Sequence, residues 1–317
     1  MAKTIQSTNY DILITDLLHE LTIKADEADR CNEMLARLAQ YKPTDKLPIE
    51  VVDFIGNYST IQIVGKEGLI MDGIGLIRKA LEGVIKAILW ILEKLKEIFK
   101  FLFNSQYRAC KETLELQRRV IVLSTNADAV TRFESTNCTV VQKKDVDELI
   151  FKTQSLTQLI RNCSKMDSKE YVDQLLKTFS ADCGVALDPD NKLTDSTPNP
   201  SPLHGTTFGG AGWTVNGLSM TINDYLGTIR GIESLKSLQR EVETTAGDLK
   251  KRAERAVLGD VSQGDAMKLQ KEASVKITMT QIMTYAIAIS VRRSDCILAF
   301  LSAVVNELSK ASKFKAV

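Results

Sequence analysis

The stretch GLIMDGIGLIRKALEGVIKAILWILEKLKEIFKFLF, residues 68–103, decides the expected fold. Its apolar residues recur at steps of three or four, which places their side chains along one face of an α-helix. An unbroken helix of this length would extend about 50 Å. Because so wide an apolar face must be buried, we expect it to pack against other helices. The expected helix-packing interface consists of Ile74, Ile77, Leu81, Ile88, Leu92, Leu95 and Phe99.

The segment that precedes this helix divides into two parts. Residues 9–41 have a helical pattern of apolar residues. Pro43 and Pro48 end it, because proline does not continue a helix and restricts the residue before it. Residues 48–64 contain short apolar groups without a helical period. We therefore expect residues 1–67 to form a helical N-terminal arm followed by an extended tether.

The segment from residue 68 to residue 183 is expected to be helical around the central helix. The pattern continues over residues 107–123, with a kink or turn expected near residues 104–105. Residues 126–142 fit a loop or a short strand. Helical patterns return at residues 145–162 and 168–179.

Residues 184–217 interrupt the helical pattern. Proline removes a backbone donor and glycine raises the entropic cost of order, so their clustering predicts one long Pro/Gly-rich loop. Trp213 lies within this range, which indicates that part of the loop docks on another part of the protein. The residues responsible are Pro189, Pro198, Pro200, Pro202, Gly205, Gly209, Gly210, Gly212 and Gly217.

Residues 218–317 are expected to form a C-terminal helical region. Residues 222–238 carry a helical stripe, residues 240–255 read as a charged, solvated face between two helical ends, and residues 265–312 form a second long helical pattern. Gly259 and Gly264 mark a turn between them. Strand patterns are nearly absent, so we predict an all-α fold, a bundle of long and medium amphipathic helices.

Charge and composition narrow the classes of function. The 41 Lys and Arg residues nearly balance the 40 Asp and Glu residues, whereas nucleic-acid binding by counterion release usually needs a basic excess. We therefore expect no specific nucleic-acid recognition. The six cysteines form no CxxC pair, which favours free thiols in a reducing compartment. The longest uninterrupted apolar run is residues 87–92, and the N-terminus lacks a signal-peptide pattern, so we expect a soluble protein.

The sequence contains no complete motif for catalysis or for metal binding. His19 begins like a zinc-binding HExxH motif, but Ile23 occupies the position of the second histidine. The other histidine, His204, is remote in sequence. No GxGxxG frame, phosphate-binding loop or GxSxG motif is complete. We expect no catalytic residue, no cofactor and no metal site, and hence no enzyme activity.

Residues 48–103 carry a family resemblance. A helical arm precedes a proline-bearing tether with the pair Asn57-Tyr58, the triplet Gly65-Lys66-Glu67 and a long helix rich in Ile, Leu, Trp and Lys. This order resembles internal head proteins of large tailed bacteriophages, which are virion structural proteins. The resemblance implies a non-enzymatic protein that is made in the host cytoplasm and packed in the head interior of the virion, together with other virion proteins or with copies of itself.

The same resemblance implies proteolytic processing. In such phages a head-maturation protease cuts after a small residue, any residue and then Glu. Gly65, Lys66 and Glu67 fit this processing site, and so does the triplet at residues 80–82. A cut after Glu67 would make residues 1–67 a propeptide and leave Gly68 as the new N-terminus.

Two alternatives remain open. The wide apolar face around Trp90, with its lysines, is also typical of a helical pore-forming or membrane-active protein. The missing signal peptide and the missing 20-residue span weigh against membrane contact. The third hypothesis is a cytoplasmic adaptor or scaffold whose helices pair with another protein.

Overall fold

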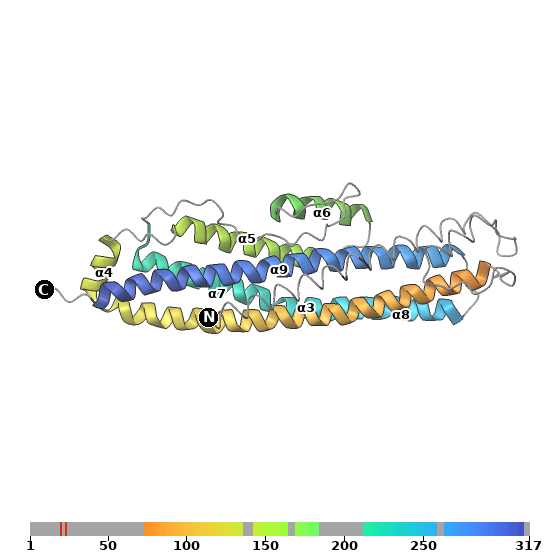
Figure 1. The fold of residues 1–317 in the computed structure, drawn as a ribbon, viewed down its shortest axis with the longest axis horizontal. Helices are drawn as coiled ribbons and strands as arrows, with labels where there is room; N and C mark the ends of the chain where they lie inside the picture. The colour runs from red at the N-terminus through yellow and green to blue at the C-terminus, as the bar shows by residue number, and fades with distance from the viewer. Residues whose placement is uncertain are drawn as a thin grey trace. The chain divides into compact units, whose positions relative to one another are not determined.

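A computed structural model describes Glu20, Ile23 and residues 73–135, 142–163, 169–183, 212–258 and 263–313. All regular structure in these residues is α-helical, which confirms the all-α prediction. The arm and tether at 1–67, apart from Glu20 and Ile23, and residues 184–211 of the expected loop lie outside the described residues. The long helices are drawn in Figure 1 and are α3 (Gly73–Ser124), α4 (Ala127–Ser135), α5 (Lys143–Cys163), α6 (Lys169–Cys183), α7 (Val215–Glu233), α8 (Leu235–Leu258) and α9 (Gln263–Lys313).

Helix α3 is longer than the sequence indicated. It passes through Asn104 and Ser105, so the turn expected there is wrong. The reason is that buried residues continue on both sides of this point at helical spacing, from Leu102 to Gln106 and Ala109. Packing therefore favours one continuous helix, and the polar pair Asn104-Ser105 does not break it.

Helix α4 replaces the loop or strand expected over its range. The side chain of Asn126 accepts a hydrogen bond from the main-chain N–H of Ala129 at 3.1 Å, which satisfies a free donor of the first turn. Ala129 and Phe133, four residues apart, are both buried. A short amphipathic helix with a cap is thus stable here. Helices α5 and α6 confirm the helical patterns at residues 145–162 and 168–179.

Helix α7 begins inside the range expected to be loop. Thr214 caps it: the threonine side chain accepts a hydrogen bond from the N–H of Gly217 at 2.9 Å. Gly212 has a φ of 112°, a left-handed conformation that favours glycine. Between Gly212 and the cap, Trp213 is buried in the core, which confirms that this part of the chain docks.

Helix α8 includes the charge-rich residues 240–255, so these do not separate two helical ends. Val242, Ala246 and Leu249 are buried at helical spacing, and the charged residues lie mostly outside that stripe. Helix α9 confirms the second long helical pattern, and it already includes Gly264, which was expected in a turn.

The chain divides into two compact units that combine distant segments. Unit 1 comprises residues 1–96, 164–197 and 240–282, and unit 2 comprises residues 97–163, 198–239 and 283–317. Three of the boundaries fall within α3, α8 and α9, so each unit contains a segment of each of these helices.

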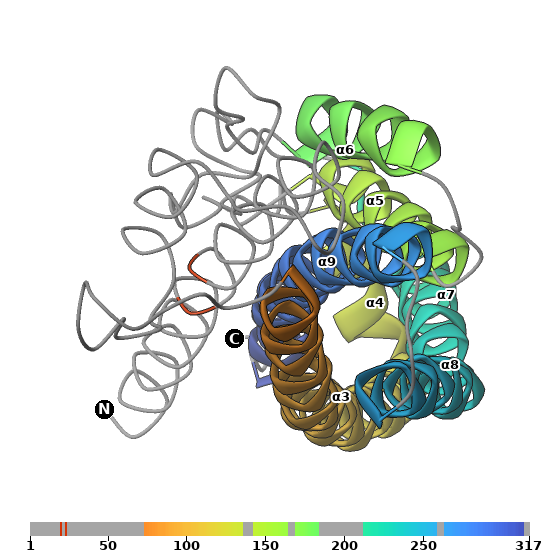
Figure 2. The same cartoon turned by 90° about the vertical axis from the view of Figure 1, so that its right-hand side faces the viewer.

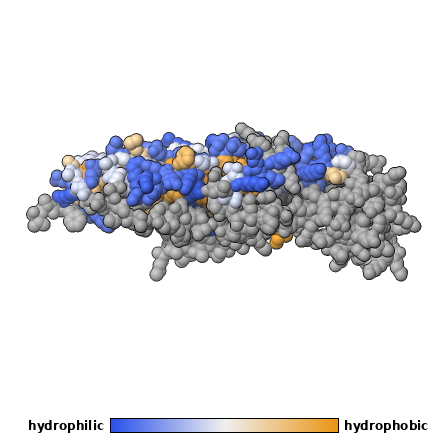
Figure 3. All heavy atoms as spheres, turned by 90° about the horizontal axis from the view of Figure 1, so that it is seen from above, coloured by the Kyte–Doolittle hydropathy of each residue, from blue (hydrophilic) through white to orange (hydrophobic). Residues whose placement is uncertain are grey.

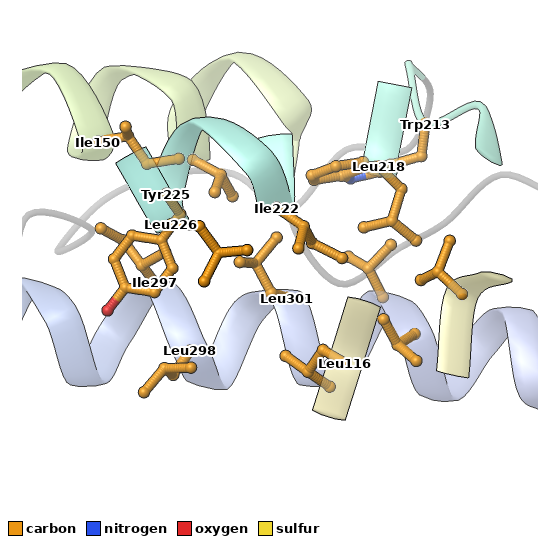
Figure 4. Close-up of a cluster of buried hydrophobic side chains, with 14 of the residues drawn as sticks. Leu116, Ile150, Trp213, Leu218, Ile222, Tyr225, Leu226, Ile297, Leu298 and Leu301 are labelled. Atoms are coloured by element: carbon orange, nitrogen blue, oxygen red, sulfur yellow. The ribbon is translucent and has the colours of Figure 1, made fainter. Parts of the chain in front are cut away.

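Unit 2 contains a continuous hydrophobic core. The segment of α9 at residues 283–291 is buried at every position, as expected for a helix surrounded by other elements. Figures 1 and 2 both show α5 beside α7 and α9, and Arg293 of α9 donates to the main-chain oxygen of Lys152 in α5 at 3.1 Å. Figure 4 shows apolar side chains of α7 and α9 directed toward one another, among them Ile222, Tyr225, Ile297 and Leu301.

In unit 1, the described contacts join the three long helices and the N-terminal residue Glu20. Leu95 of α3 lines a small recess together with side chains of α8 and α9, including Val242 and Met279. Lys94 forms an ion pair with Glu20 at 3.1 Å.

On the face shown in Figure 3, hydrophilic residues predominate over the described part, and hydrophobic residues occupy separate small areas.

Candidate functional site: a helix-packing interface

The interface expected from the sequence lies along α3. Leu95 and Phe99 are buried, as are Ile98 and Leu102 beside them. The other expected members belong to α3, but their side-chain surroundings are outside the described residues, so their role in packing stays a prediction: Ile74, Ile77, Leu81, Ile88 and Leu92. The expected processing site at Gly65, Lys66 and Glu67 also lies outside the described residues.

Helices α5 and α7 are joined by a ladder of polar side chains. The hydroxyl of Thr221 donates to the Asp147 carboxylate at 3.0 Å, and the side-chain amide of Gln154 donates to the Thr228 hydroxyl at 3.0 Å. Both pairs are separated by 74 residues in the sequence. Because both partners advance together along their helices, α5 and α7 run parallel, as two strands of a coiled coil can do.

The ladder continues at the end of α7. The Arg161 guanidinium donates to the main-chain oxygen of Gly231 at 3.1 Å and also contacts the Ser234 hydroxyl. The last carbonyls of a helix lack intrahelical partners and carry partial negative charge. Arg161 therefore ties α5 to the C-terminus of α7 by a charge-assisted bond, and it fixes the register of the two helices.

Helices α3 and α9 are also parallel within unit 2. Arg108 contacts the Asp295 carboxylate at 2.6 Å, and Arg119 donates to the Asn306 side chain at 2.8 Å. The separation in sequence is 187 residues in both pairs. These side chains are half-buried or exposed, so each pair adds little free energy. Their equal offset identifies the alignment of the two helices.

Helix α7 bonds to both α3 and α9. Gln117 of α3 donates to Asn223 at 2.7 Å, and Tyr225 donates its hydroxyl to the main-chain oxygen of Ser294 at 3.1 Å. Burial raises the pKa of Tyr225 above its ordinary value, so its phenol is neutral in the folded protein. A neutral hydroxyl is a donor, which is what the Ser294 carbonyl requires.

Burial governs the chemistry of two of the described thiols. Cys110, Cys163 and Cys296 are free, and burial raises the pKa of the Cys163 thiol to about 12. The pKa of Cys296 is also raised, first by burial and then by the nearby Asp295 carboxylate. Because the thiolate is the reactive form, Cys163 and Cys296 are poor nucleophiles at neutral pH.

Neither a metal-binding group nor a membrane span occurs in the described part of the chain. No group of three or more His, Cys, Asp or Glu residues is placed to hold a metal ion there. None of the helices searched there is both long and apolar enough to cross a bilayer. No protein-family model, no curated protein and no solved structure matches this sequence.

The helical patterns of the sequence do not show which side chains connect the helices. Asp147, Gln154 and Arg161 recur every seven residues beside the apolar stripe of α5. Thr221 and Thr228 have the same spacing within the stripe of α7. Polar residues at seven-residue steps in two neighbouring helical patterns are a signal for such pairing, but the partner helix is specified only by the fold.

Proposed function

We propose that this protein is a non-enzymatic structural component of a bacteriophage virion, packed in the head interior, and that it works through helix–helix contacts. The observation that carries the proposal is that polar side chains in unit 2 form hydrogen bonds between neighbouring helices. Asp147, Gln154 and Arg161 bond to a neighbouring helix at regular steps. Groups employed in this way fix the alignment of helices, which suits an architectural role.

The sequence resemblance supplies the location. Residues 48–103 share their order of features with internal head proteins of large tailed phages, from the proline-bearing tether to the long amphipathic helix. The near balance of 41 basic and 40 acidic residues supports a place beside packaged DNA, because a protein without a large positive charge does not condense on phosphates.

The position of α3 supports the processing step. A cut after Glu67 would leave Gly68 as the N-terminus, a short distance before α3 begins at Gly73. Cleavage there removes the arm and tether and keeps the whole of α3 in the mature protein. Proteases act on extended chain, so a cut between tether and helix is compatible with the helical fold.

Protease protection of purified phage particles tests the location. In intact, DNA-filled particles the protein should resist an added protease, and it should be digested once the heads are opened by osmotic shock. A surface protein of the same particles is the control, since it is cut in both samples. Digestion of the protein in intact particles would contradict a place inside the head.

A further inference from the structure

An apolar stripe is exposed along α3 in unit 2. Tyr107, Leu114, Ile121 and Val122 are 74%, 38%, 59% and 68% exposed. Tyr107, Leu114 and Ile121 recur every seven residues, so they lie on one face of the helix, with Val122 at its edge. In the described part of unit 2, the other large exposed apolar residues are Phe151 on α5 and Met220 on α7.

This stripe lies on the outer side of α3. The residues on either side of Arg118 hold the helix in place: Gln117 bonds to Asn223 of α7, and Arg119 bonds to Asn306 of α9. The Arg118 side chain between them is 78% exposed. Successive helical residues differ by about 100° in direction, so the face that contains Arg118 points away from α7 and α9.

Two cations alternate with the apolar residues of the stripe. Lys111 and Arg118, both exposed, follow Tyr107 and Leu114 by four residues and precede Leu114 and Ile121 by three. This alternation of three and four is the spacing of a coiled-coil seam, with apolar residues at one position and cations at the other. The exposed Glu115 carboxylate lies 3.9 Å from the Arg118 guanidinium, on the same helix.

We propose that this outer face of α3 docks an amphipathic helix of another protein that has an apolar seam alternating with Asp or Glu. The charges favour this occupant. A second copy of the chain would bring Lys111 and Arg118 close to the same two cations, which is destabilising. An acidic helix pairs its carboxylates with both cations while its apolar residues cover Tyr107, Leu114 and Ile121. The stripe extends about 22 Å, the length of two heptads.

A synthetic peptide tests the inference with the purified full-length protein, whether or not the protein belongs to a virion. The probe is a fluorescein-labelled helix of about three heptads with Leu at one seam position and Glu at the other. Its matched control has Lys in place of each Glu. We expect the Glu peptide to bind, its affinity to fall as salt rises, and the Lys peptide to bind at least about tenfold more weakly.

Variants of the protein locate the contact. Leu114→Glu should weaken binding of the Glu peptide at least about tenfold, because it places a charge in the centre of the seam. Met220→Glu, on α7, is the matched control and should leave binding unchanged. The double variant Lys111→Glu/Arg118→Glu should reverse the preference, so that the Lys peptide binds more tightly. Circular dichroism checks that all variants remain helical.

Four outcomes would overturn the inference. Equal binding of both peptides would contradict recognition by charge. Equal effects of Leu114→Glu and Met220→Glu would contradict the location of the contact on α3. Self-association of the protein that Leu114→Glu abolishes would identify a second copy as the occupant. Binding to vesicles of anionic phospholipid that is lost in the same variant would identify a lipid surface instead.

Discussion

Tyr225 of α7 donates its hydroxyl to the main-chain oxygen of Ser294 in α9, at 3.1 Å, and its ring belongs to the hydrophobic core of unit 2. The Ser294 hydroxyl is also within hydrogen-bonding contact of the phenol. Both residues are buried. A single side chain thus combines apolar packing with a bond that holds α7 at one position along α9. Because a hydrogen bond needs its partners at fixed positions, such a bond specifies the alignment of the two helices.

Removal of the Tyr225 hydroxyl should therefore be costly. We expect Tyr225→Phe to lower the free energy of unfolding by about 1–2 kcal/mol, because the ring still packs but buried acceptors at Ser294 lose their donor. Urea denaturation followed by circular dichroism measures the change. Tyr107→Phe, at an exposed position, is the control and should change stability by less than about 0.5 kcal/mol. Equal effects of the two substitutions would show that the buried bond does not matter.

The raised pKa of Tyr225 predicts a loss of stability in alkali. Burial raises this pKa above the value of about 10 for an unfolded tyrosine, so the folded state keeps a proton that the unfolded state loses. The contribution of the protonated phenol to the free energy of unfolding is therefore complete below pH 10. Above pH 10 it declines by up to about 1.4 kcal/mol per pH unit. Between pH 9 and 11 the free energy of unfolding of the wild type should fall more steeply than that of Tyr225→Phe. Parallel pH profiles would contradict the assignment.

The α5–α7 ladder predicts that removal of the Thr221 hydroxyl lowers the stability of the protein. Thr221→Val keeps the shape of this buried side chain but removes the donor to Asp147, so we expect a loss of about 1 kcal/mol. The Asp147 carboxylate is partly exposed and regains water, which limits the effect. Thr244→Val, on the exposed side of α8, should stay within about 0.5 kcal/mol of the wild type. Thermal unfolding scans of both variants provide the comparison.

The N-terminal cap of α7 also predicts a loss of stability, here from a hydrogen bond within one helix. Thr214→Ala removes the acceptor for the N–H of Gly217 and should cost about 1 kcal/mol, whereas Thr214→Ser keeps the acceptor and should cost much less. Since Thr214 follows Trp213, the alanine variant should also loosen the docking of that indole. Quenching of tryptophan fluorescence by acrylamide, in a Trp90→Phe background, should increase in Thr214→Ala and remain low in Thr214→Ser.

The buried thiol of Cys163 should resist alkylation. Burial raises its pKa to about 12, so almost no thiolate exists at pH 8, and the side chain is covered in the folded state. Peptide mapping after iodoacetamide treatment should find Cys163 unmodified in the native protein and fully modified in guanidinium chloride. Half-buried Cys110 serves as the internal comparison and should react faster. Fast labelling of Cys163 in the native protein would contradict its place in the core.

The regular parts of the fold follow from the sequence because periodic apolar residues report directly on a buried helix face. This holds for α5 and α9, and it holds for Trp213, whose large apolar side chain in a polar loop indicated docking. Helix α8 was misread because small residues such as Ala246 form its buried stripe among many charges. Helix α4 was missed because it is short and depends on the Asn126 cap.

The connections between helices could not be predicted in the same way. The bond between Tyr225 and Ser294 depends on which helices are neighbours and on how far one is shifted along the other. Periodicity within a single helix contains neither quantity. The exposed stripe at Tyr107, Leu114 and Ile121 could not be predicted for the same reason. Only the fold determines which apolar stripe is buried and which is exposed.

Mass spectrometry of purified mature phage particles tests the central claim most directly. We expect the protein to be present in DNA-filled heads with Gly68 as its first residue, and peptides from residues 1–67 to be missing. Absence of the protein from the particles would contradict its role as a virion component. Its presence with an intact N-terminal arm would contradict the processing step and the assignment of residues 1–67 as a propeptide.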